Sequence, residues 1–186
     1  MNNNKSTQVI TGENTRFSYL NVFEPKSING GAPKYSVSLI IPKSDKKTID
    51  SLWAAIKTAY TEGSEKLKNS NGTVPPFESI HCPIRDGDLE RPGDPAYADS
   101  FFLNANSKNP PLIVDKNNHE FFDPSQVYSG MYGLANISFY PYSVSGNRGI
   151  ACSLNALKIL RDGEPLGYRK PKAEDYFTEE YEEFFV

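Results

Sequence analysis

The chain has 186 residues, which is enough for one well-buried domain and too few for two of ordinary size. Hydrophobic residues make up 38% of it and aromatic residues 12%, with 14 Pro and 13 Gly, and this composition is typical of a loop-rich β protein. The N-terminal residues are polar and no later run approaches the roughly 18 apolar residues of a membrane span, so we expect a soluble, cytoplasmic protein.

Two segments near the N-terminus have the pattern of paired strands. Residues 34–41 (KYSVSLII) alternate apolar and polar side chains, which predicts a strand with one buried face. Residues 15–23 (TRFSYLNVF) also favour a strand, and the turn cluster EPKSINGGAP lies between the two. We therefore predict a hairpin with a long loop.

The period changes to that of a helix after the first hairpin. Apolar residues recur at helical spacing from Ile49 to Tyr60, Ser44 or Asp45 can cap the N-terminus, and Gly63 can end the helix. Residues 70–99 are then rich in Pro, Gly and Asp, which predicts a long ordered loop.

Strand signals return in the second half of the chain. Residues 100–105 and 112–116 favour short strands, and residues 127–142 and 148–160 flank the turn SVSGN as a long hairpin. The chain thus has five to seven strands and one helix after the first hairpin. Because strands and helices do not alternate, the pattern predicts a mainly β protein with a small closed or partly open barrel, not a parallel α/β sheet.

The acidic residues gather at the C-terminus, where residues 173–186 contain six acidic side chains and no Lys or Arg. We therefore divide the chain into a slightly basic domain, residues 1–172, and an acidic tail. The tail's aromatic residues are Tyr176, Phe177, Tyr181, Phe184 and Phe185. Such a tail can cover a basic groove of its own domain or insert its rings into partner proteins. Alternatively, it forms a last helix whose rings pack on the barrel.

Residues 134–142 alternate between an apolar and a polar face. Ala135, Ile137 and Phe139 share the apolar face, whereas the other face combines tyrosines with Asn and Ser and is too polar for a core. Exposed rings can stack on unpaired bases, so the stacking candidates are Tyr132, Tyr140 and Tyr142. The basic residues that would contact phosphates are Lys34, Lys108, Arg148, Lys158 and Arg161. The alternative is that the tyrosines only favour β structure and cap the barrel rims, while the basic residues are ordinary surface charges.

Motifs for catalysis or cofactor binding are missing from the sequence. Cys82 and Cys152 have no CxxC partner, neither histidine has metal-ligand spacing, and no phosphate-binding glycine motif occurs. Five loop acids could hold Mg²⁺ in a nuclease, namely Asp86, Asp88, Glu90, Asp94 and Asp99. They lie in Pro- and Gly-rich sequence, so we interpret them as solvated loop acids or as residues with a structural role at the barrel mouth, and we expect no enzyme, metal or cofactor.

Several sequence blocks resemble a known family when they are taken together. The blocks are KYSVSLIIPKS (34–44), NISFYPY (136–142) and GIACSLNALKILRDGEPLG (149–167), with NVFEP (21–25), DGD (86–88) and Asn104-Ala105. In combination they resemble a phage family long catalogued as a domain of unknown function, whose characterised kind is a single-stranded DNA-binding protein with an OB-fold barrel.

The resemblance implies sequence-tolerant binding of single-stranded DNA during phage replication or recombination, without cofactors. From its own acids and rings, we expect the tail to modulate access to the DNA site or to recruit replication or recombination proteins of the phage or host. The tail is similar in style to those of other single-strand binders, although Val186 follows Phe185. The second hypothesis from the residues is a phage structural or interaction protein with the same kind of β barrel.

Overall fold

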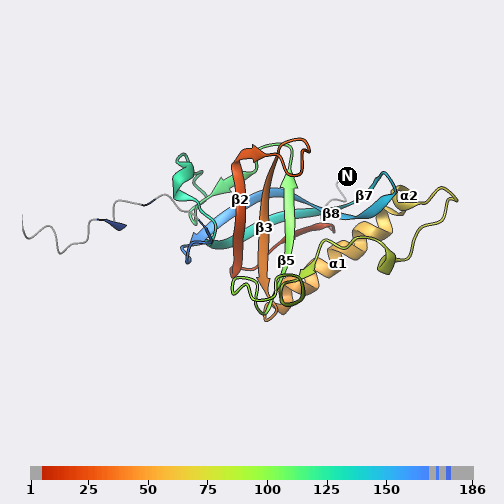
Figure 1. Ribbon diagram of the computed structural model, residues 1–186, viewed down its shortest axis with the longest axis horizontal. Helices are drawn as coiled ribbons and strands as arrows, with labels where there is room; N and C mark the ends of the chain where they lie inside the picture. The colour runs from red at the N-terminus through yellow and green to blue at the C-terminus, as the bar shows by residue number, and fades with distance from the viewer. Residues whose placement is uncertain (1–5, 168–170, 172–174, 177–186) are drawn as a thin grey trace, which may run out of the picture.

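Five long strands close into a barrel in the computed structural model, which describes residues 6–167, 171 and 175–176 (Figure 1). The described strands are β1 (Gln8–Ile10), β2 (Thr15–Lys26), β3 (Lys34–Pro42), β4 (Arg85–Asp86), β5 (Ser100–Ser107), β6 (Leu112–Val114), β7 (Tyr132–Val144) and β8 (Asn147–Arg161). The described helices are α1 (Lys46–Glu62), α2 (Ser64–Leu67) and α3 (Gly87–Glu90). The protein is therefore mainly β, as the sequence predicts.

The order of strand pairing is that of an OB fold. β2 pairs with β3 and β3 with β5, all antiparallel, and β5 then meets β8 in parallel. β8 pairs with β7 over a long antiparallel hairpin, and β7 returns to β2 to close the barrel. Both predicted hairpins are confirmed. The short strands β1, β4 and β6 extend the sheet, which brings the strand number to eight instead of the predicted five to seven.

Alternate residues of the long strands fill the inside of the barrel. Phe17, Leu39 and Leu103 are fully buried there. On β7, Ala135 and Ile137 are buried as well, which confirms the predicted apolar face of this strand. Since side chains alternate between the two faces of a strand, this inner core leaves the intervening residues of β2, β3 and β5 on the outer surface.

Helix α1 begins and ends at residues that the sequence offers for the purpose. The Asp45 side chain accepts a hydrogen bond from the backbone N–H of Thr48 at 3.2 Å, and Gly63 is the C-cap. The buried face, with Leu52 and Ile56, covers β7 and β1 at one side of the barrel (Figure 1). Within the described ranges no helix is long and apolar enough to cross a membrane.

A second, smaller apolar cluster lies outside the barrel. It consists of Ile40 on β3, Phe102 on β5 and Tyr97, with Ala96 and Leu166 packed against it. Tyr97 belongs to residues 85–99, which we call the outer segment; it contains β4 and α3 and lies over β5. The sequence predicts an ordered loop for this part of the chain. The structure shows in addition that the Tyr97 ring packs edge-to-face on Phe102 and so anchors the segment to the outer face of the sheet.

Candidate nucleic-acid interface

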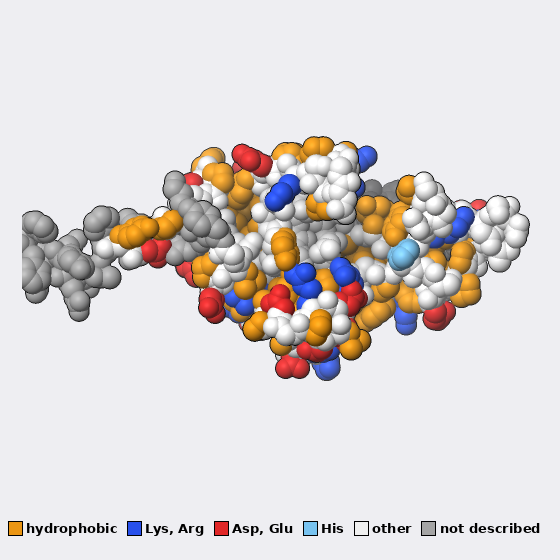
Figure 2. Space-filling model, in the orientation of Figure 1, with side chains coloured by type: hydrophobic (Ala, Val, Ile, Leu, Met, Phe, Trp, Pro, Cys, Tyr) orange, Lys and Arg blue, Asp and Glu red, His pale blue; other side chains and the backbone are white. Residues whose placement is uncertain are grey.

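The outer face of β2, β3 and β5 contains a hollow of about 550 Å³, which we call the first hollow. Its floor is polar and is made of Ser36 and Ser38 on β3 and Asn104 and Asn106 on β5. Figure 2 shows the hollow near the middle of this face, with Lys and Arg side chains above and below it. The outward positions of the barrel strands therefore form a concave surface rich in hydrogen-bonding groups.

The lining of the first hollow is positively charged. Lys26 and Lys34 border it on the first hairpin and Arg85 and Arg91 on the outer segment, whereas none of its lining residues is acidic. Neither lysine forms an ion pair with any residue that the structure describes. Arg85 pairs with Glu90 at 2.5 Å, and Arg91 lies 4.0 Å from Asp94. The hollow therefore attracts anions.

Aromatic rings lie among these cations. The Arg85 guanidinium is 4.8 Å from the ring centroid of Phe102. The Arg91 guanidinium is 4.5 Å from the ring of Tyr97 and 5.4 Å from that of Tyr19, and its Nη2 donates to the Tyr19 hydroxyl at 2.7 Å. This hydrogen bond is the main cause that raises the pKa of Arg91 above its ordinary value. The rings and cations thus share one surface.

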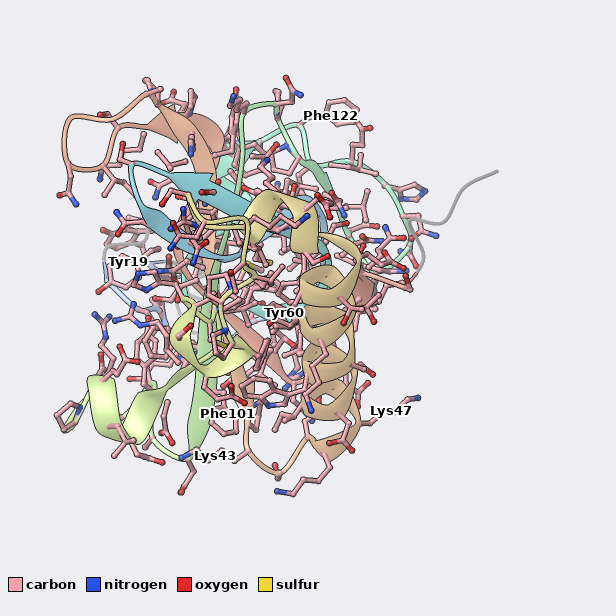
Figure 3. All side chains as sticks on the ribbon, turned by 90° about the vertical axis from the view of Figure 1, so that its right-hand side faces the viewer. Tyr19, Lys43, Lys47, Tyr60, Phe101 and Phe122 are labelled. Carbon is pink, nitrogen blue, oxygen red and sulfur yellow. The ribbon has the colours of Figure 1, made fainter. Side chains whose placement is uncertain are left out.

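Tyr19 itself has an unusual backbone. Its φ is +48°, in the region that side-chain-bearing residues rarely adopt, and the register of β2 against β3 shifts between Ser18 and Asn21. The resulting bulge turns the Tyr19 side chain outward, where it is 60% exposed. Figure 3 shows the ring at the edge of the molecule opposite Lys47 of α1. Backbone strain that presents a ring to solvent is a common property of binding sites.

A second hollow of about 700 Å³ lies on the other side of the outer segment. Arg16 on β2, Tyr132 on β7 and Lys43 are among its lining residues. Lys43 Nζ pairs with Asp86 at 2.8 Å and with Asp88 at 2.7 Å, which ties the base of the outer segment to the end of β3. These bonds lower the pKa of both carboxyl groups and raise the pKa of Lys43.

The predicted contact residues divide into two groups. Lys34 lines the first hollow and Tyr132 lines the second. Arg161 lines neither hollow, but its guanidinium lies 4.2 Å from the Tyr132 ring. The others, which line neither hollow, are Tyr140, Tyr142, Arg148, Lys158 and Lys108. Arg148 donates to the Lys68 carbonyl beside α2, at the far end of the β7–β8 hairpin. The polar face of β7 was thus predicted correctly, but no residue at its outer end lines either hollow. Figure 1 shows this end of the β7–β8 hairpin beside α2.

The predicted tail residues are mostly beyond what the structure describes. Tyr176 is exposed. Phe177, Tyr181, Phe184 and Phe185 lie outside the described residues. The acidic loop residues are placed, and Asp86 and Asp88 are held by Lys43. Among the described residues, no three His, Cys, Asp or Glu side chains are positioned to hold a metal ion.

Sequence reasoning missed five residues of the first hollow, three of which belong to the outer segment. Tyr19, Arg85, Arg91, Tyr97 and Phe102 were not among the predicted contacts, although all five line the first hollow. The segment is an acidic loop in the sequence, and its two arginines are noticeable only because they bracket the run DGDLE. That bracketing was the one available signal.

The protein is a five-stranded OB barrel, and the hollow on its outer face is lined by basic side chains and aromatic rings. These features place it among the OB-fold proteins whose surface is suited to nucleic acids. Within this class the chain belongs to the family of the single-stranded DNA-binding protein of Enterobacter phage Enc34, whose family model matches residues 7–185. The resemblance found in the sequence blocks is confirmed.

Individual relatives agree with this assignment. A protein named p50 from Acyrthosiphon pisum secondary endosymbiont phage 1 is 32% identical over 155 residues, which cover 81% of this chain and 82% of p50. The structure of the bacteriophage Enc34 protein in complex with single-stranded DNA has a TM-score of 0.70 at 24% identity, over 88% of this chain and 91% of that one. The single-stranded DNA-binding protein gp2.5 of bacteriophage T7 has a TM-score of 0.58 at 16% identity, over 92% and 95% of the two chains. These structures share the fold.

Proposed function

We propose that the protein binds single-stranded DNA with little sequence preference during phage DNA replication or recombination, and that the first hollow is the binding site. One observation carries the proposal: four basic side chains and three aromatic rings line the hollow, and none of its lining residues is acidic. The likeness to a structure solved in complex with single-stranded DNA supports it. The activity requires no chemical step and belongs in the cytoplasm of the infected cell.

The two kinds of side chain have different tasks in this proposal. Lys26, Lys34 and Arg85 neutralise phosphates, which gives affinity that falls as salt rises. The exposed Tyr19 ring stacks on a base, an interaction worth about 1–3 kcal/mol and available to every base. Because the faces of paired bases are covered by their neighbours in a duplex, the ring selects single strands. The Asn and Ser floor contacts base edges without requiring one sequence.

A binding titration tests the proposal. Labelled oligo-dT should bind the full chain at low salt and dissociate steeply as salt rises, and a duplex of equal length should bind more weakly. The double variant K34M/R85M removes two charges from the first hollow, and K47M/K57M removes two from the exposed face of α1 as the matched control. Only the first variant should lose affinity. Equal losses in both variants, or a preference for duplex, would contradict the proposal.

We further propose that residues 173–186 compete with DNA for the first hollow. The tail has six acidic side chains and five aromatic rings, which is the same pairing of negative charge and flat rings that single-stranded DNA offers. Truncation after Lys172 should therefore raise the affinity for oligo-dT, most of all at low salt. If the truncated chain binds as the full chain does, the tail does not compete, and recruitment of replication or recombination proteins is then the role to test.

A further inference from the structure

One row of side chains crosses six strands on the outside of the barrel. Strand register pairs each member with the next, so all of them project from the same surface. We call it the cross-strand row; from β8 to β4 it consists of Arg161, Tyr132, Arg16, Ile40, Phe102 and Arg85. Neighbouring strands are about 4.8 Å apart, so the row is about 24 Å long.

The cross-strand row reaches into both hollows and runs beneath the outer segment between them. Phe102 and Arg85 line the first hollow, while Arg16 and Tyr132 line the second. Ile40 lies between them beneath Tyr97, where the outer segment touches the sheet. A strand bound in the first hollow therefore meets further basic side chains on β2, β7 and β8 if it continues past the outer segment, which buries Ile40 and Phe102 in the middle of the row.

The far end of the row is a cluster of two arginines and one ring. Tyr132 has a guanidinium on each side along the row, with Arg16 at 5.3 Å and Arg161 at 4.2 Å from the ring centroid. Arg16 donates to the carbonyls of Gly130 at 3.2 Å and Glu164 at 2.6 Å. These two hydrogen bonds hold the Arg16 guanidinium in place beside the Tyr132 ring.

The partners of both arginines are neutral. Arg161 donates to the carbonyl of Glu13 and to Asn14 Oδ1, both at 2.9 Å, and Arg16 donates to carbonyls alone. Neither forms an ion pair with a carboxylate of the described residues. A guanidinium has five N–H donors, so each retains donors for a ligand as well as its full charge. Two fixed, uncompensated charges suit a phosphodiester.

We infer that Arg16 and Arg161, positioned by Tyr132, form a second contact site for the phosphates of the same DNA strand that occupies the first hollow. The inference rests on the proposed function. Tyr132 then acts as the support between two arginines instead of a platform for a base, which differs from the stacking role predicted from the sequence. The ligand at this site is the phosphodiester backbone of a single strand long enough to reach from the first hollow past the outer segment to the second hollow.

Length dependence separates this site from the first hollow. At the 3.4 Å spacing of stacked nucleotides, about seven are needed to cover the row, and fewer if the strand is extended. Oligo-dT of about four nucleotides can occupy only one hollow at a time, whereas about twelve nucleotides reach both. An arginine at the far end should therefore matter for the long oligonucleotide alone.

The test compares these two lengths on the full chain by fluorescence anisotropy. R161M should weaken binding of the long oligo-dT about tenfold and of the short one less than twofold. It should also flatten the salt dependence for the long oligo-dT, by about 0.7 in the slope of log K against log salt. R161K retains the charge and should restore most of the affinity. K57M, an exposed charge on α1, is the matched control and should change neither length.

If R161M affects both lengths equally or neither, or if R161K binds as weakly as R161M, the inference is overturned while the first hollow stands. If K34M/R85M leaves both lengths unchanged, the proposed function itself fails. Thermal unfolding checks the fold, because Arg161 also ties the Glu13 carbonyl to β8. Should R161M lower Tm, the comparison is made with R161Q, which keeps a donor for that carbonyl and removes the charge.

Discussion

Arg91 and Tyr19 join the outer segment to strand β2 across the first hollow, through a hydrogen bond of 2.7 Å from Nη2 to the phenol oxygen. The same guanidinium lies beside the rings of both Tyr19 and Tyr97. The hydrogen bond holds Tyr19 at its hydroxyl edge, and the residue as a whole stays 60% exposed. A base that stacks on Tyr19 therefore lies beside the Arg91 guanidinium, whose charge is close enough to meet the adjoining phosphate.

Variants at Tyr19 separate the ring from its hydroxyl. Y19A removes the ring and should weaken oligo-dT binding by about 1–3 kcal/mol, whereas Y19F keeps the ring, releases Arg91 and should bind at least as well as the parent. F122A is the matched control, since Phe122 is 93% exposed and lies outside both hollows (Figure 3). Anisotropy titration at one fixed salt concentration measures all three. Parent-like binding by Y19A would show that this ring does not stack.

Substituting alanine for either of two glycines adds one methyl group, at the outer segment in one case and inside the β7–β8 pairing in the other. The two variants therefore test the binding site and the barrel separately. A Cβ at Gly87 would lie 2.2 Å from the Tyr97 carbonyl oxygen, and a Cβ at Gly133 would lie 1.9 Å from the Lys158 carbonyl oxygen. G87A should push the outer segment off β5 and weaken DNA binding with a small loss of stability. G133A should strain the β7–β8 pairing and lower the free energy of unfolding by about 1–3 kcal/mol. Denaturant unfolding and DNA titration of both variants measure these two losses. If G87A and G133A lose the same stability and the same DNA affinity, the prediction is wrong.

The pairing of Lys43 with Asp86 and Asp88 predicts a response to acid. Lys43 lowers the pKa of both carboxyl groups, so the contact stabilises the folded state fully above their ordinary pKa of about 3.9. That contribution is lost as pH falls through the lowered values. Carboxyl NMR titrations should give midpoints below the ordinary value in the parent and higher midpoints in K43M. K46M is the control, and unchanged midpoints in K43M would disprove the assignment.

Both cysteine thiols should react slowly with maleimide, and the fully buried Cys152 should react more slowly than the half-buried Cys82. Burial raises the pKa of Cys152 strongly and that of Cys82 to a smaller extent, which reduces the reactive thiolate at neutral pH. In the C82S variant, labelling of the remaining Cys152 should proceed only as fast as the protein unfolds. Maleimide labelling followed by mass spectrometry measures this rate. Rapid labelling under native conditions would mean that β8 opens locally.

Local patterns were enough to predict most of the fold. The alternation in residues 34–41 and in residues 127–160 predicted both hairpins, and the spacing from Ile49 with Asp45 and Gly63 predicted α1. These features depend on neighbours in sequence, through strand periodicity, turn residues and helix caps. The family blocks then indicated the OB barrel, which the strand order confirms.

The site was harder to predict because it depends on register between distant strands. Arg16 meets Tyr132 only because β7 returns to β2, and Phe102 meets Arg85 only because the outer segment pairs with β5. No local pattern specifies these pairings. Tyr140 and Tyr142 followed the alternation correctly, but alternation identifies a face of a strand and not its position around the barrel.

The two apolar clusters have no residue in common: Leu39 and Leu103 belong to the interior, whereas Ile40 and Phe102, their immediate neighbours in sequence, belong to the cluster under Tyr97. Folding and recognition are therefore encoded by interleaved but separate sets of positions. Substitutions that change the shape of the first hollow need not destabilise the barrel interior. Members of the family can therefore change their affinity for a ligand while the barrel stays the same.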